Sequence, residues 1–90
     1  MKINPNYKVR TVAGENIVLL QGKMGGEMTR VVAFNDSALF LWNQLQGKDF
    51  SIADAAKTLM EHYEVAESTA IDDVVKWIQV LRENGLMLEP

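Results

Sequence analysis

Apolar and polar positions alternate in the first third of the chain, and this pattern predicts β-strands. Residues 7–12 alternate and carry β-branched side chains, residues 16–21 form a second short apolar run, and residues 29–34 form a third. Turn-forming residues at 13–16 separate the first two runs, and a glycine-rich segment at 22–28 separates the second from the third. Three short strands with hairpin spacing predict a small antiparallel sheet.

From Asn35 onward the apolar spacing changes to that of a helix. The first predicted helix has apolar residues at i, i+3, i+4 and i+7, counted from Ala38, and it is apolar over most of its circumference. We expect such a helix to be sandwiched between other elements. Asn35 or Asp36 can cap its N-terminus by accepting hydrogen bonds from free backbone N–H groups. Gly47 fits the left-handed position that ends it.

Two further helices follow. The second begins after Ser51, which forms a capping-box pattern with Asp54, and its apolar side chains fall on one face. The third is predicted from residue 67 or 68 to residue 84, with Gly85 after its end and Trp77 at the flank of a broad apolar face. A short extended tail follows it. The order βββααα predicts an α+β fold that is winged-helix-like, with a three-stranded antiparallel sheet followed by three helices.

Length and composition describe one folded unit. The chain has 90 residues, of which 48% are hydrophobic, and we expect residues 1–90 to form a single domain. The absence of cysteine excludes disulfides, a thiol nucleophile and thiolate zinc ligands. No apolar run approaches the roughly 20 residues that cross a bilayer, and the N-terminus lacks the apolar stretch of a secretory signal. We therefore expect a cytoplasmic protein without a membrane partner.

No group of residues in the sequence has the pattern of a catalytic or metal site. His62 is the only histidine and lies off the main apolar stripe of its predicted helix. The serines stand at predicted helix starts, where capping accounts for them. Asp72 and Asp73 are adjacent, so on a helix they point about 100° apart and cannot act on one substrate atom together. We therefore expect no enzymatic activity, no catalytic residue, no metal and no cofactor.

Charge is distributed unevenly and argues against a nucleic-acid partner. Residues 1–34 carry five basic and two acidic side chains, whereas residues 35–90 carry four basic and ten acidic ones. The third predicted helix, which would be the recognition helix of a DNA-binding winged helix, carries two basic and four acidic side chains. The phosphates of a duplex would repel it. Protein or peptide binding is the favoured class of function, and DNA binding ranks last.

The strand predicted at residues 29–34 is the candidate binding edge. An exposed strand edge presents unpaired N–H and C=O groups that can pair with another strand. Alternation puts two sets of side chains on opposite faces: Arg30, Val32 and Phe34 on one, and Thr29, Val31 and Ala33 on the other. We expect Val32 and Phe34 to face the helices. Trp77 fits best as a core residue, and it also suits the wall of a pocket for an incoming side chain.

The order of these motifs resembles the PqqD-like family. The resemblance spans about residues 7–88 and rests on four groups: Val31-Val32-Ala33-Phe34-Asn35; Ala38, Trp42, Leu45 and Gly47; Ser51-Ile52 with Ala55, Ala56, Leu59 and Tyr63; and Asp73-Val74 with Trp77, Ile78, Leu81 and Gly85-Leu86. It implies a recognition element for RiPPs, the ribosomally made and later modified peptides. Such a domain binds the leader segment of the precursor peptide and presents it to a modifying enzyme, such as a radical-SAM enzyme.

The resemblance also implies where the leader lies: as an added strand beside residues 29–34, in a groove against the third helix. Carried onto this chain, with the helix positions taken from helical spacing, it implies these peptide-binding residues: Thr29, Arg30, Val31, Val32, Ala33, Phe34, Asp73, Val74, Trp77, Ile78 and Leu81. Gln46 departs from the family, in which an acidic residue is common at that position. Nothing marks the pyrroloquinoline quinone pathway, so that product is not predicted. The alternative is a winged-helix module that docks onto another protein, or forms a homodimer, through the same edge.

Overall fold

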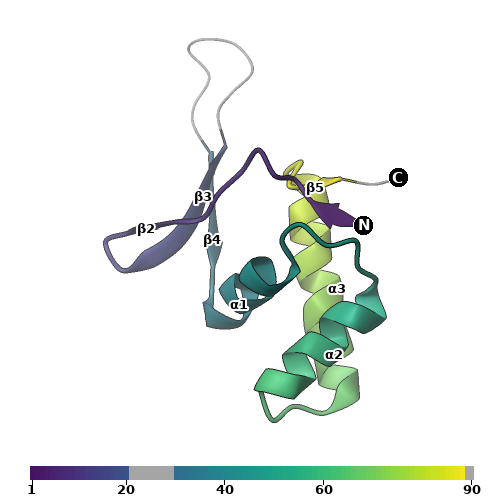
Figure 1. Ribbon diagram of the computed structural model, residues 1–90. Coiled ribbons are helices and arrows are strands. Elements are labelled where there is room, and N and C mark those ends of the chain that lie inside the picture. The colour runs from purple at the N-terminus through teal and green to yellow at the C-terminus, as the bar shows by residue number, and fades with distance from the viewer. Residues whose placement is uncertain (21–29, 89–90) are drawn as a thin grey trace.

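The computed structural model describes residues 1–20 and 30–88, and for Arg30 the backbone alone. Its elements follow the chain in this order: β1 (Lys2–Ile3), β2 (Arg10–Val12), β3 (Glu15–Leu20), β4 (Arg30–Phe34), α1 (Asp36–Leu45), α2 (Ile52–His62), α3 (Glu67–Glu83) and β5 (Met87–Leu88). Figure 1 shows the three-stranded sheet on one side and the helices on the other, with α1 between β4 and α3. The predicted α+β fold, a three-stranded antiparallel sheet followed by three helices, is confirmed.

The main sheet has the strand order β2-β3-β4, so β4 is an edge strand among the described strands. Within the antiparallel β3–β4 pair, Val18 lies opposite Val32 and Leu19 lies opposite Val31. Val18 and Val32 are buried, whereas Leu19 and Val31 are exposed. The alternation predicted for β4, with Val32 and Phe34 toward the helices, is therefore confirmed.

The first strand is shorter than predicted, because pairing begins at Arg10 rather than at residue 7. Residues 7–9 alternate as a strand does, but alternation alone does not create a partner strand. Among the described strands they have none. The glycine-rich hairpin loop predicted at 22–28 lies outside the described residues, as does Thr29.

A second, two-stranded sheet joins the two ends of the described chain. Lys2 pairs with Leu88 and Ile3 with Met87, in antiparallel order. The Asn4 backbone N–H extends this contact by donating to the carbonyl of Leu86 at 2.8 Å. Figure 1 shows β1 and β5 side by side at the end of α3. The sequence pattern predicted only an extended tail here, because strands of two residues carry no periodicity.

The predicted side-chain caps at the starts of α1 and α2 are confirmed. Asn35, not Asp36, caps α1, since its Oδ1 accepts from the Ala38 backbone N–H at 2.9 Å. At the start of α2, the Asp54 N–H donates to the Ser51 hydroxyl and the Ser51 N–H donates to the Asp54 carboxylate. This reciprocal pair satisfies donors that the first turn of a helix leaves free.

Both helix-ending glycines adopt the predicted backbone conformation. Gly47 and Gly85 have φ angles of 74° and 71°, values that other residues adopt only with strain. Each glycine therefore turns the chain immediately after a helix.

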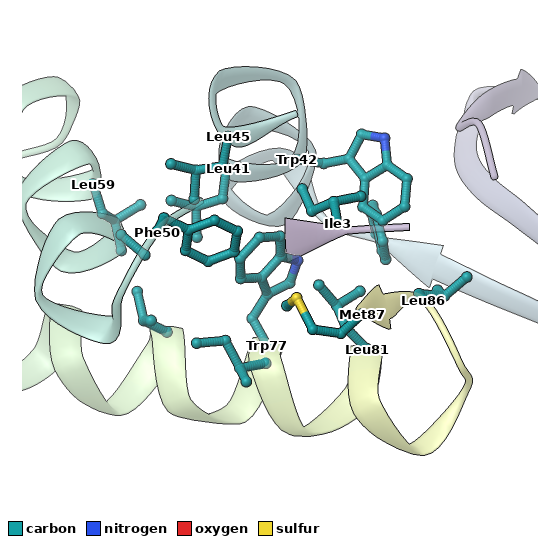
Figure 2. Packing of buried hydrophobic residues seen from close by; sticks show 14 of the residues in the cluster. Ile3, Leu41, Trp42, Leu45, Phe50, Leu59, Trp77, Leu81, Leu86 and Met87 are labelled. Atoms are coloured by element: carbon teal, nitrogen blue, oxygen red, sulfur yellow. The ribbon is translucent and has the colours of Figure 1, made fainter. Parts of the chain in front are cut away.

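The core runs between the sheet and the three helices, and Trp77 belongs to it. Only 7% of Trp77 is exposed, and Figure 2 shows its ring between Phe50 and Met87, close to Ile3. The prediction that Trp77 fits best as a core residue is confirmed. The buried stripe of α3 consists of Ala70, Val74, Trp77, Ile78 and Leu81. The sequence pattern placed the valines of α3 and Ile71 on one broad apolar face. In the structure only Val74 of this set is buried, whereas Ile71, Val75 and Val80 are exposed.

Candidate functional site

A groove lies between the end of β4 and one flank of α3. Its volume is about 280 Å³. Its lining comes from β4, from the start of α1, from α2 and from α3: Ala33, Phe34, Asn35, Ser37, Ala38, Leu41, Leu59, Asp73, Lys76, Trp77 and Val80. We call it the β4–α3 groove. It lies next to the edge of the main sheet, so a segment that pairs with β4 would have this groove beside it.

The α3 wall of the groove is one helical stripe. Asp73, Lys76, Trp77 and Val80 follow the spacing i, i+3, i+4 and i+7, which places them on a single flank of the helix. Asp73, Lys76 and Val80 are exposed, whereas Trp77 is buried for most of its surface. The wall therefore combines an apolar surface with two opposite charges one turn apart.

Trp77 can contribute the surface of its indole ring to the groove, but not a hydrogen bond. Its Nε1 is buried and has no hydrogen-bond partner in the described part of the structure, and the same holds for Nε1 of Trp42. An unpaired buried N–H costs about 1–3 kcal/mol. Because the Trp77 nitrogen is already shielded, a ligand in the groove can contact only the exposed part of the ring.

The β4 wall is fixed by the capped junction between strand and helix. Phe34 packs against Trp42 of α1, with ring centroids 5.4 Å apart and planes tilted by 57°. Asn35 then caps α1, which sets the direction in which the chain leaves the sheet. These contacts hold the last residues of β4 in place, while the strand keeps an edge without a described partner strand. Such an edge can accept a further strand by backbone hydrogen bonding.

The structure brings four of the predicted site residues together: Ala33, Phe34, Asp73 and Trp77 all line the groove. Val31 is exposed on the outer face of the sheet, and Val32 is buried beneath it. For Arg30 only the backbone, in β4, is described, and Thr29 lies outside the described residues.

The other three predicted helix positions do not line the groove. Val74, Ile78 and Leu81 are almost completely buried in the core. Lys76 and Val80 line the groove instead, and sequence reasoning missed them. Successive helical residues are about 100° apart. A groove-lining stripe that begins at Asp73 therefore lies on a different face of α3 from one that begins at Val74. The sequence offered one indication, since an i, i+3, i+4, i+7 stripe from Asp73 is more polar than one from Val74 and suits a partly exposed wall.

The described residues do not gather into a metal site. No three of their His, Asp or Glu side chains lie close enough together to hold a metal ion. His62 stacks on Phe40, with ring centroids 4.1 Å apart and planes 17° from parallel. None of the described helices is both long enough and apolar enough to cross a membrane.

Residues 16–87 match the model of a family described as Coenzyme PQQ synthesis protein D (PqqD). The matched range is well over half of the chain. It contains all of β3 except Glu15, together with β4, all three helices and both walls of the β4–α3 groove. No curated protein matches the chain, and no solved structure does.

Proposed function

We propose that this chain, which belongs to the PqqD family, binds the leader segment of a ribosomally synthesised precursor peptide and presents it to a modifying enzyme. The observation that carries the proposal is the β4 edge with the β4–α3 groove directly beside it. The chain would act by binding alone, with no cofactor, and residues 1–90 would form one recognition domain. Radical-SAM enzymes are one class of partner enzyme that the family resemblance implies.

Strand addition at β4 supplies affinity that depends little on the leader's sequence. The backbone N–H and C=O groups of residues 30–34 would pair with those of the leader. Alternate side chains of an added strand point to opposite faces, so every second leader side chain would point toward α3. The backbone contacts would therefore hold the leader, and the groove would select among leaders.

The groove selects for an apolar side chain with polar neighbours. Trp77, Val80 and Phe34 supply apolar surface. Asp73 and Lys76 stand on the same wall with opposite charges and would favour leaders that carry complementary groups. Exposed ion pairs contribute only about 0–1 kcal/mol each, so we assign most of the affinity to strand pairing and apolar contact.

Presentation follows from binding two partners at once. A leader held on β4 keeps the remainder of the precursor close to any enzyme that is bound to the same domain. Binding of that kind raises the effective concentration of the substrate at the enzyme without any new contact to the reacting residues.

The test is a nuclear magnetic resonance titration of the ¹⁵N-labelled chain with the leader peptide encoded next to it. We expect amide shifts in residues 30–34 and at positions 73, 76, 77 and 80 on α3. Shifts confined to α1 and β2, with those positions silent, would contradict the proposal.

Proline substitution tests the edge directly, because proline removes an N–H from a strand. Val31→Pro in β4 should weaken leader binding. Thr11→Pro, in the opposite edge strand β2, is the matched control. Val12 and Glu15 flank the two-residue turn and bond to each other, so the N–H of the next residue, Thr11, points away from β3. Circular dichroism checks that both variants fold. Equal affinities in the two folded variants would point to a different surface.

A further inference from the structure

A second groove lies between α2 and the start of α3, outside the proposed leader site. Its volume is about 740 Å³, and its lining is Ile52, Ala53, Ala56, Lys57, Met60, Glu61, Glu67 and Ile71. We call it the α2–α3 groove. Three large apolar side chains in it, Ile52, Met60 and Ile71, are exposed. The leader site uses none of these residues.

The spacing of the lining residues on α2 suits a helix as the occupant. Residues 52, 56 and 60 form one row at i, i+4 spacing, and residues 53, 57 and 61 form a second row beside it. Such rows are the ridges between which the side chains of a packed helix insert. At 1.5 Å per residue each row is about 12 Å long, which is slightly more than two turns of a helix. Ala53 and Ala56 have short side chains, which allow a close approach.

The charge around the groove favours a basic occupant. Its lining contains one basic and two acidic side chains, Lys57 against Glu61 and Glu67. Residues 52–83, which span α2 and α3, contain three basic and seven acidic side chains. An acidic surface attracts cationic partners and repels anionic ones, including a second copy of the same surface.

We propose that the α2–α3 groove binds an amphipathic helix of a partner protein, with apolar side chains at i, i+3 or i+4, and i+7 and with lysine or arginine along its flanks. The groove is separate from the leader site. Ile71 and Val80, which line the two grooves, are nine residues apart and so point roughly 180° from each other on α3. A partner helix in one groove therefore leaves the other open, and the inference stands without the leader.

The test uses two synthetic helical peptides that share one leucine face, with lysines on the polar face of one and glutamates on that of the other. The probes are titrated into the labelled full chain. The lysine peptide should bind, shift the amides of residues 52–61 and 67–71, and lose affinity as salt rises. The glutamate peptide should bind much more weakly. Equal binding of the two peptides, shifts at residues 30–34 and 73–80 instead, or self-association with no response to either peptide would overturn the proposal.

Two variants separate apolar contact from charge. Met60→Gln keeps a good helix former while it removes apolar surface, and it should weaken the lysine peptide about fivefold. Glu61→Lys combined with Glu67→Lys should reverse the preference between the two peptides. Val12→Ser, an exposed position on the sheet, is the control and should bind as the unaltered chain does. Because all these positions are exposed, thermal unfolding should show folded variants, and an unchanged peptide preference in the charge-reversed chain would refute the assignment.

Discussion

Replacing Val80 with serine should weaken leader binding by a factor of about three to eight and leave the fold intact. Val80 lines the β4–α3 groove, and 39% of it is exposed in the free chain. Complete burial of a valine side chain is worth about 1.5–3 kcal/mol. A leader bound in the proposed way would cover only the part that is still exposed, so its contact with Val80 would contribute about 0.6–1.2 kcal/mol. That free energy corresponds to about a three- to eightfold change in Kd.

Val75 provides a matched control on the same helix. It is exposed to 43%, close to the value for Val80, but it does not line the β4–α3 groove. Valine and serine have similar helix propensities, so Val75→Ser and Val80→Ser should have similar effects on α3 itself. The assay is fluorescence anisotropy with a labelled leader peptide, together with urea unfolding of both variants.

The comparison of the two variants decides the outcome. A loss of affinity in Val80→Ser alone, at equal stability, supports the groove on this flank of α3. Unchanged affinity in Val80→Ser, or an equal loss in Val75→Ser, would show that the leader does not cover Val80 and would refute the reasoning.

Three further predictions concern the fold. Leu81→Ala, at a position with no exposed surface, should lower the free energy of unfolding by about 2–5 kcal/mol in a urea titration, and a loss below 1 kcal/mol would contradict its place in the core. Ser51→Ala removes half of the capping box and should lower the free energy of unfolding by about 1 kcal/mol in the same titration. An unchanged free energy of unfolding would show that the Ser51 hydroxyl adds no stability. The hydrogen bond and charge of the N-terminal ammonium of Met1 lower the pKa of Asp49 below its ordinary value of 3.8. The stabilisation by this pair is therefore present above about pH 3.8 and is lost as the pH falls through the lower pKa of the folded state. A carboxyl titration by nuclear magnetic resonance should give a midpoint below 3.8, and an N-terminal extension that displaces the amine should raise it.

The sequence determined the parts of this protein that depend on neighbouring residues. Asn35 and the Ser51–Asp54 pair marked where helices begin, because a side-chain cap satisfies N–H groups only three residues away. Gly47 and Gly85 marked where helices end, since each needs a left-handed backbone. The alternation in β4 gave its buried and exposed faces, because side chains on a strand alternate whatever the strand packs against.

Only the tertiary structure decided which flank of α3 meets the core and which remains open. The helix is apolar around much of its circumference, so its pattern allowed several rotations, and packing against Phe50 and Met87 placed Trp77 inside. That rotation exposed Lys76 and Val80 at the groove and buried Ile78, which the sequence had assigned to the site. The β1–β5 pair likewise depends on residues more than 80 positions apart. Contacts of that kind leave no periodic trace in the sequence, because neither strand is long enough to show one and each depends on the other being in place.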